Sequence, residues 1–78
     1  GENDMRTIKV GKTYKHFKGA VVKIIAIARH TETDEMLVIY KHLETDEVWA
    51  RPYEMFIGEV DNKKYPNVEQ KYRFEEYR

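Results

Sequence analysis

Apolar residues occur along the chain in short runs that are rich in valine and isoleucine. Residues 20–29 (AVVKIIAIAR) and 36–43 (MLVIYKHL) are the longest of these runs, and 47–51 (EVWAR) is a shorter one. β-Branched side chains fit the pleated surface of a sheet and lose rotamer freedom in a helix, so the runs predict strands. A further short strand is expected at 13–17 (TYKHF), because Gly19 marks a turn after it.

Two nearly identical polar segments separate the three runs. HTETDE at 30–35 and HLETDE at 42–47 contain threonine and aspartate side chains that bond nearby backbone amides. Aspartate also tolerates the left-handed conformation that a hairpin needs. Because the offset between the two segments equals one strand plus one turn, the pattern predicts an antiparallel meander.

The C-terminal half is less regular. Pro52 cannot donate to a sheet ladder and is a candidate first helical residue, so we expect the third run to end there and one helical or 3₁₀ turn near 52–56. Residues 61–64 (DNKK) predict another turn, and 67–78 could form a last strand or pack loosely. Short strands, polar turns and no strong helix predict an all-β fold of about five strands, closed into a small barrel because closure removes exposed strand edges.

Centring the two turns near 32–34 and 45–46 predicts which residues face each other. The register pairs Ile39 with Ile27 and His42 with Trp49. Its expected core face holds Ile25, Ile27, Leu37, Ile39, Leu43, Val48 and Ala50. Its expected polar face holds His30, Tyr40, His42, Trp49 and Arg51. A slip of one residue would exchange the two faces, but it would bury Arg51 and His42 at a high cost.

The groups on this polar face are suited to recognition. Trp49 and Tyr40 offer flat rings for stacking, and the Arg51 guanidinium offers a planar fork of donors for a carboxylate or a phosphate. A purely structural role stays open, because cross-strand aromatic pairs also stabilise ordinary sheets.

Composition places the chain in the class of small single domains. Of the 78 residues, we expect 10–75 to form the domain, 1–9 to be an N-terminal extension that is partly disordered or left from tag removal, and 76–78 to be a tail. There is no cysteine, which permits a reducing compartment. No apolar run approaches the about 18 residues of a membrane span. We therefore expect a cytoplasmic protein without membrane attachment.

Charge balances overall but is unevenly distributed. Residues 1–29 carry seven basic and two acidic groups, whereas 30–62 carry two basic and nine acidic groups. A dedicated nucleic-acid binder usually has a net basic domain, so a protein or a small anionic ligand is the expected partner. The basic N-terminal stripe keeps single-stranded nucleic acid, RNA above all, as the alternative; its members are Arg6, Lys9, Lys12, Lys15 and Lys18.

The residues offer little for catalysis or metal binding. The chain has no cysteine and no serine, and its four glycines are too widely spaced for a phosphate loop. The three histidines lack the close spacing of metal ligands, and His30 and His42 fall near opposite ends of neighbouring strands. We expect no enzymatic activity, no cofactor and no metal; a small metal-dependent enzyme is the least favoured alternative.

Three motifs resemble one bacterial family. GKTYKHFKG (11–19), ARHTET (28–33) and WARPYEMF (49–56) occur in the order found in the family called domain of unknown function 1653, over about residues 10–75. The resemblance implies a small Src-homology-3-like β-barrel of cytoplasmic bacterial origin, and no reaction. The family usually has glycine where this chain has Asp34, which can adopt the left-handed conformation at modest cost.

The resemblance also bears on the site. Members of the family are most alike at the positions that match Tyr14, His16, Phe17, Gly19, Arg29, His30, Glu32, Trp49, Arg51, Pro52, Met55 and Phe56. Register and resemblance together predict a ligand-binding site made of Arg29, His30, Tyr40, His42, Trp49, Arg51 and His16. The chain is expected to be a monomer or a weak homodimer.

Overall fold

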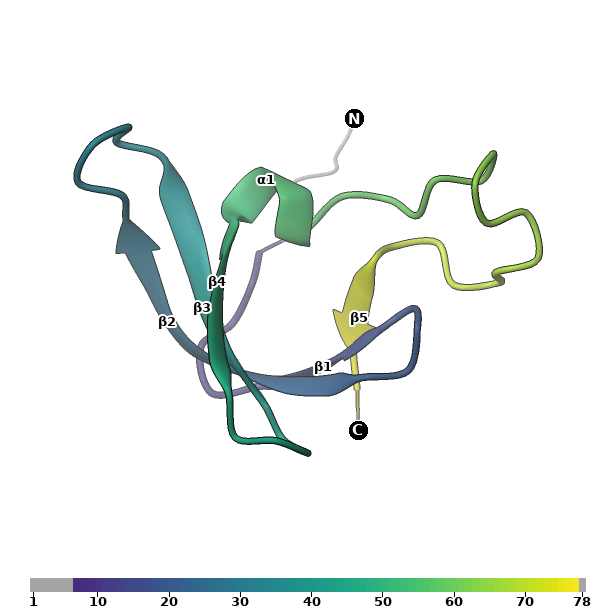
Figure 1. Ribbon diagram of the computed structural model, residues 1–78, viewed down its shortest axis with the longest axis horizontal. Coiled ribbons are helices and arrows are strands. Elements are labelled where there is room, and N and C mark those ends of the chain that lie inside the picture. Colours follow the sequence, from purple (N-terminus) through teal and green to yellow (C-terminus); the bar gives the residue numbers. More distant parts are fainter. Residues whose placement is uncertain (1–6, 78) are drawn as a thin grey trace.

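Five strands form one antiparallel sheet in the computed structural model, which describes residues 7–77 (Figure 1). The elements in chain order are β1 (Thr13–His16), β2 (Val21–Arg29), β3 (Met36–His42), β4 (Val48–Pro52), α1 (Tyr53–Phe56) and β5 (Phe74–Glu76). The order of strands across the sheet is β4-β3-β2-β1-β5. The prediction of an all-β fold with five antiparallel strands is confirmed.

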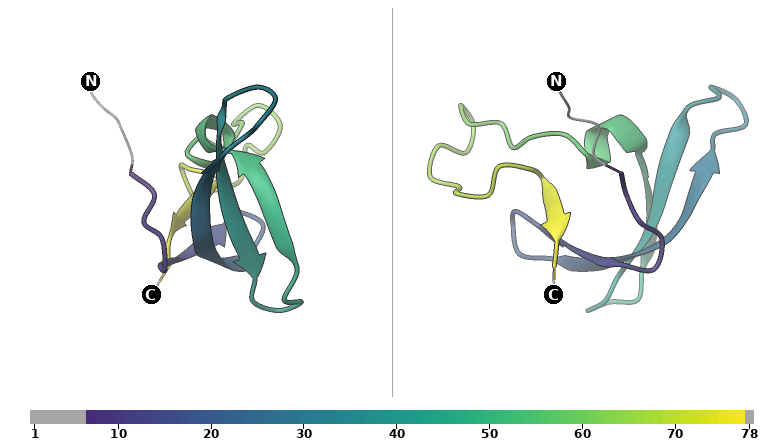
Figure 2. Two further views of the ribbon diagram at one scale, coloured as in Figure 1. Left: turned by 90° about the vertical axis from the view of Figure 1, so that its left-hand side faces the viewer. Right: turned by 180° about the vertical axis from the view of Figure 1, so that it is seen from behind.

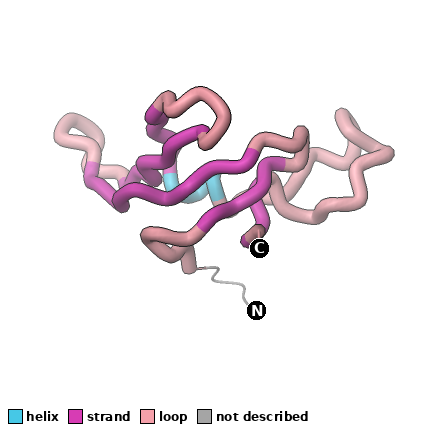
Figure 3. Tube along the Cα trace, turned by 90° about the horizontal axis from the view of Figure 1, so that it is seen from below, coloured by secondary structure: helices cyan, strands magenta, loops and turns pink. Residues whose placement is uncertain are grey.

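The sheet is open rather than closed into a barrel. β4 and β5 form its two edges, and no ladder joins them within the described part of the chain. The sheet bends instead, so that β2, β3 and β4 rise on one side while β1 and β5 form the other (Figures 1 and 2). α1 lies behind the layer of strands when the molecule is seen from below (Figure 3). The irregular segment 57–73 then leads from α1 back to β5.

The two polar segments form two equivalent turns, as predicted. The backbone N–H of Asp34 donates to the carbonyl oxygen of His30 at 2.9 Å, and that of Asp46 donates to the carbonyl oxygen of His42 at 2.7 Å. Asp34 and Asp46 both have φ of 64°, in the left-handed region. The threonine and aspartate pattern therefore specifies the same backbone twice.

The register between β2 and β3 differs from the predicted one. Ile27 pairs with Val38 rather than with Ile39. An irregularity just after Ile24 then shifts the ladder again, so that Ile24 pairs with Tyr40. Because side chains alternate along a strand, an offset of one residue exchanges the faces.

The core consequently lies on the face that the sequence predicted to be polar. Its buried residues are Ile8, Tyr14, Val22, Ile24, Val38, Tyr40, Phe56, Val60 and Phe74. Of the seven predicted core residues, Ile27 packs against this cluster, whereas Ile25, Leu43 and Val48 are exposed, Val48 at 59%. The core prediction was wrong because both faces of residues 20–29 are apolar, so that alternation alone could not select one of them.

The register between β3 and β4 is offset by two residues from the predicted one. Tyr40 pairs with Trp49, and Val38 pairs with Arg51. An offset of two keeps every side chain on its face. The predicted neighbours therefore still meet diagonally: the rings of His42 and Trp49 have centroids 6.0 Å apart, and Arg51 bonds to the Tyr40 hydroxyl.

The C-terminal half completes the core. The predicted helical turn is confirmed as α1, with Pro52 as the residue that precedes it. The side chains of Phe56 and Phe74 stack at the centre of the core, with ring centroids 4.0 Å apart and planes 8° apart. The turn predicted at 61–64 is also present, where the Asp61 side chain accepts hydrogen bonds from the N–H groups of Lys63 and Lys64.

The packed unit extends slightly beyond residues 10–75. Ile8 is buried in the core, and its N–H donates to the Tyr53 hydroxyl at 3.0 Å. At the other end, the N–H of Tyr77 donates to the carbonyl oxygen of Thr13. The expectation for residues 1–6 lies outside the described residues. No helix within 7–77 is long and apolar enough to cross a membrane.

Candidate functional site

Two adjoining cavities lie on the concave side of the sheet and share His16, Lys18 and Arg51. The first, of about 370 Å³, is completed by Ala20, Tyr40, His42, Trp49 and Phe74. The second, of about 270 Å³, is completed by Phe17, Asp61, Lys64, Tyr65 and Arg73. We call the two cavities together the basic groove. Its walls come from β1 and the β1–β2 turn, from β3 and β4, and from segment 57–73 and the start of β5.

Arg51 lies where the two cavities meet. Its Nε donates to the Tyr40 hydroxyl at 3.4 Å, and its guanidinium carbon lies 5.4 Å from the centre of the Phe74 ring. These contacts position the guanidinium against buried aromatic rings. Arg51 forms no ion pair with a carboxylate of residues 7–77. Donors of its planar fork therefore stay available to a ligand in either cavity.

Three further cations line the second cavity. The Lys18 and Lys64 ammonium groups lie 5.3 Å and 5.6 Å from the centre of the Tyr65 ring. Arg73 Nη1 donates to the carbonyl oxygen of Met55 at 3.4 Å. With Arg51, the cavity has four cations against the single carboxylate of Asp61, a net charge of +3 with His16 neutral. Such a concentration of one sign of charge in a cleft attracts anions.

His16 shows the effect of this positive field. Burial, followed by the charges of Arg51 and Lys18 and smaller contributions from His42 and Arg73, lowers the pKa of His16 from 6.5 to about 4. Its Nδ1 accepts a hydrogen bond from the Lys18 N–H at 3.0 Å, which requires an unprotonated nitrogen. The imidazole is therefore neutral at physiological pH, and the groove's positive charge belongs to lysine and arginine.

Tyr65 is affected by the same cations. A hydrogen bond from Lys18 lowers the pKa of its phenol, and the charges of Lys18 and Lys64 act in the same direction. The ring also makes an edge contact with Phe17, with centroids 4.9 Å apart. Lysines and aromatic rings are thus interleaved at this end of the groove.

The first cavity is more apolar and ends at Trp49. This indole is 52% exposed although it sits opposite the buried Tyr40 in the ladder. The His42 ring contacts both, with centroids 5.7 Å from Tyr40 and 6.0 Å from Trp49. An exposed flat ring beside a neighbouring ring is a suitable stacking surface.

The structure brings together five of the seven predicted site residues: His16, Tyr40, His42, Trp49 and Arg51. It does not bring Arg29 and His30 to them, because these two residues lie at the opposite end of the β2–β3 hairpin. Arg29 Nη1 donates to the Asp34 carbonyl oxygen at 2.9 Å and lies 3.4 Å from its carboxylate. His30 Nδ1 accepts hydrogen bonds from the N–H groups of Glu32 and Thr33. Both side chains therefore stabilise their own turn.

Sequence reasoning missed the cations and rings of the second cavity. Lys18 is predictable as a cation near the aromatic face through the nucleic-acid alternative, whereas Lys64, Tyr65 and Arg73 belong to an irregular segment without hydrophobic periodicity. The net positive charge of residues 63–78 was the one available signal. It gave no indication of which groups the fold would place beside Arg51.

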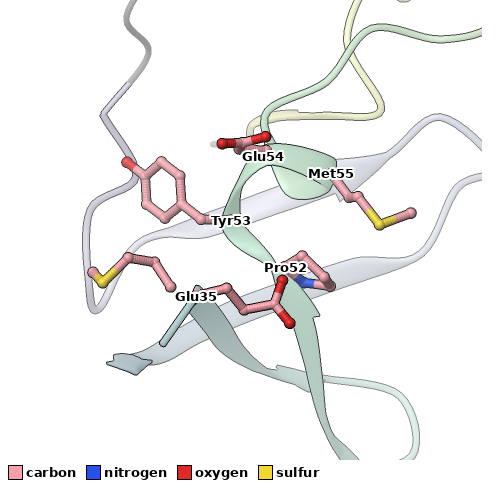
Figure 4. A pocket seen from close by; sticks show the side chains of 6 residues that line it. Glu35, Pro52, Tyr53, Glu54 and Met55 are labelled. Atoms are coloured by element: carbon pink, nitrogen blue, oxygen red, sulfur yellow. The ribbon is translucent and has the colours of Figure 1, made fainter. Parts of the chain in front are cut away.

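A third cavity, of about 420 Å³, lies away from the basic groove (Figure 4). The first residues of α1, among them Tyr53 and Met55, form one wall, and Glu35 and Met36 at the start of β3 form another. Its charged groups are the carboxylates of Glu35 and Glu54. Nothing else in the described chain indicates what would fill it. Residues 7–77 contain no group of three or more histidine, aspartate or glutamate side chains placed to hold a metal ion.

The fold and the cavities define a small all-β domain with an open antiparallel sheet and a basic, aromatic-lined groove. The family model "Protein of unknown function (DUF1653)" matches residues 12–76, and the chain belongs to this family. The family resemblance predicted from the sequence is thereby confirmed. The comparison with curated proteins gave no match, and neither did the comparison with solved structures.

Proposed function

We propose that this domain is a non-enzymatic binding module that holds an anionic group, a phosphate or a carboxylate, in the basic groove. The observation that supports the proposal most is the position of Arg51. Its guanidinium is held by Tyr40 and Phe74 at the junction of two cavities, without a carboxylate partner in residues 7–77. Planar guanidinium donors match the oxygens of carboxylates and phosphates.

The surrounding charges support the same proposal. Lys18, Lys64 and Arg73 line the cavity together with Arg51, although like charges held close together repel each other. Perturbed titration behaviour in a cleft, as at His16, is characteristic of functional sites. An anion in the groove would neutralise these charges, which the single carboxylate of Asp61 does not balance.

A binding role suits the groove residues better than catalysis does. The lining offers ammonium groups, guanidinium groups and rings, and the chain has no serine or cysteine to act as a nucleophile. His16 Nδ1 is already engaged by the Lys18 N–H. The anion could belong to a protein partner or to a small molecule. We further propose that the module works in the cytoplasm of a bacterium. The chain has no cysteine, so its fold does not depend on disulfides, which are rare in that reducing compartment.

The test is a titration of the ¹⁵N-labelled domain with pyrophosphate, followed by backbone amide NMR. We expect shift changes at residues 16–18, 51, 64–65 and 73, and none in the 30–35 turn. Arg51→Ala should weaken binding by about 10-fold or more, because charge-assisted hydrogen bonds are lost. Arg51→Lys should restore part of the affinity, since the charge returns without the fork.

Arg29→Ala is the matched control. It removes the same charge from the chain but from the far end of the β2–β3 hairpin. Its affinity should equal that of the parent domain. Equal losses for Arg29→Ala and Arg51→Ala, in variants that both give dispersed spectra, would show that the groove is not the site.

A further inference from the structure

The two cavities of the basic groove offer different chemistry on either side of Arg51. The first is bordered by exposed Trp49 and by His42, and its only cations are the shared Lys18 and Arg51. The second carries Lys64 and Arg73 in addition, and it contains the polar Tyr65 hydroxyl. A ligand that fills both needs a flat apolar ring next to an anionic group.

We propose that the basic groove binds single-stranded nucleic acid, with a base stacked on Trp49 and the adjoining phosphates on Arg51, Lys18 and Arg73. The proposal rests on the anion-binding function proposed above and specifies its ligand. Aromatic side chains that stack bases beside a positively charged track are the usual means by which proteins hold single strands. Every base has a π-face, so such a site can bind without reading a particular sequence.

The charge of the groove favours a strand over a free mononucleotide. The second cavity has a net charge of +3, whereas the phosphomonoester of a mononucleotide carries only about −1.5 to −2. Each phosphodiester of a strand adds a single negative charge. Two or three successive phosphates would match the groove. A nucleoside triphosphate carries comparable charge, but the chain lacks the glycine-rich loop whose backbone amides usually hold a triphosphate. The two cavities also share His16, Lys18 and Arg51, so a chain can continue from one to the next.

The aromatic wall argues against a duplex and against an acidic peptide. Bases in a duplex stack on each other, so their faces are not free to meet Trp49. Acidic side chains would satisfy the lysines and arginines but would leave the exposed indole without a flat partner. A strand with unstacked bases satisfies both parts of the groove.

The acidic turn beside Trp49 fits the proposed polarity. Residues 43–47 connect β3 to β4 directly before Trp49 and carry Glu44, Asp46 and Glu47. These carboxylates would repel phosphates at this end. A base at Trp49 and phosphates toward Arg73 is therefore the orientation that avoids like charges.

The experiment uses Trp49, the only tryptophan of the chain, as its reporter. Its fluorescence is followed while the whole domain is titrated with a hexauridylate. A hexamer of the same sugar-phosphate length without bases serves as the matched ligand. We expect the hexauridylate to quench Trp49 and to bind about 10-fold more tightly than the abasic hexamer, in keeping with the usual gain from one stacked base. Raising the salt from about 50 to 200 mM should weaken binding on the order of 10-fold, as expected for two or three phosphate contacts.

Competition by other anions tests each part of the proposal. The abasic hexamer binding as tightly as hexauridylate would overturn the nucleic-acid proposal and leave the anion-binding function standing. Uridine triphosphate competing as well as the hexamer would identify a free nucleotide and overturn the strand. Hexaglutamate competing equally would identify an acidic peptide instead. Failure of every one of these anions, pyrophosphate included, would overturn the proposed function as well.

Variants complete the test. Trp49→Ala should lose about 10-fold in affinity for hexauridylate, measured by anisotropy of a labelled strand, and almost none for the abasic hexamer. Lys18→Ala should weaken both ligands alike and reduce the salt dependence. Lys23→Ala, which removes a charge from the exposed face of β2, should change neither. Equal losses for Lys23→Ala and Lys18→Ala would overturn the placement of the phosphates.

Discussion

The two hairpin turns have nearly the same sequence and the same backbone, yet their histidine side chains make different contacts. His30 accepts hydrogen bonds from the amides of its own turn. His42 instead lies against the rings of Tyr40 and Trp49 and borders the basic groove. The local sequence therefore determines the turn, whereas the position of the turn in the sheet determines what its histidine can contact.

The cause of the difference is the neighbour that each turn meets. The second turn lies beside the start of β2, where His42 pairs with Val22 and the Leu43 N–H donates to the Val21 carbonyl oxygen at 3.1 Å. This places it next to the β1–β2 turn and its Lys18. The first turn extends from the other end of β2, beyond the last β3–β4 pair, Leu37 with Pro52 (Figure 1). Its polar groups consequently pair among themselves.

The largest expected effect is on the free energy of unfolding and concerns β2, the strand that runs between the two hairpin turns. Ile24 is 1% exposed, and its sequence neighbour Ile25 is 43% exposed because successive side chains of a strand face opposite sides. Ile24→Ala should lower the free energy of unfolding by about 2–5 kcal/mol, since it leaves a cavity in the core. Ile25→Ala should lower it by less than about 1 kcal/mol. Urea denaturation of both variants measures the difference, and similar losses would contradict the observed choice of faces.

Replacement of the two histidines separates the roles of the turns. His30→Ala should lower the free energy of unfolding by about 0.5 kcal/mol, because two turn amides lose an acceptor, and should leave ligand affinity unchanged. His42→Ala should weaken hexauridylate binding by about threefold, because Trp49 loses a supporting ring. Thermal denaturation and fluorescence titration of both variants give the two readouts. The reverse pattern would show that the first turn, not the second, belongs to the site.

The smallest effect concerns the pH dependence of the groove. The folded-state pKa of His16 is about 4, below the unfolded value of 6.5, so the unfolded chain binds more protons between these values. The stabilisation from neutral His16 is therefore fully present above pH 6.5 and is lost as the pH falls toward 4. Solvent screening around this partly exposed ring keeps the loss small. His16→Gln should show a smaller decrease in Tm between pH 7 and pH 4.5.

A bound anion should change this titration. It would offset the charges of Arg51 and Lys18, which contribute to the lowering, and so raise the pKa of His16 toward its ordinary value. The imidazole carbon-bound proton can be followed by NMR with and without pyrophosphate. An unchanged pKa at saturating pyrophosphate would place the anion elsewhere.

The sequence predicted the turns well and the faces poorly, for physical reasons. Asp34 and Asp46 act through their own backbone, so the hairpins could be predicted from a few neighbouring residues. The ladder of β2 contains an irregularity after Ile24, and no local sequence pattern predicts it, so the buried face could not be chosen from the sequence. The expected cost of burying Arg51 was also overestimated, because it keeps part of its side chain exposed and bonds to the Tyr40 hydroxyl.

The candidate site was predicted only in part. Trp49, His42 and Arg51 were grouped correctly because an offset of two residues preserves the face of a strand. Lys64 and Arg73 could not be found, since they reach the groove through an irregular segment whose course depends on tertiary packing. Arg29 and His30 share the predicted polar face with Trp49 but lie at the other end of the hairpin, because shared alternation groups residues by face and not by position along a nine-residue strand.

The open edge of the sheet has a consequence for the dynamics of the domain. Trp49 and Arg51 stand on β4 and Phe74 on β5, so the groove occupies the seam along which these two edge strands would have to pair to complete a barrel. Full pairing there would leave no room for a ligand. The outward-facing amides of β4 and β5 should therefore exchange with solvent deuterium faster than those of β2 and β3, and a ligand that bridges the seam should slow them. A ligand in the groove would connect β4 to β5 and so take the place of the strand pairing that closes a barrel.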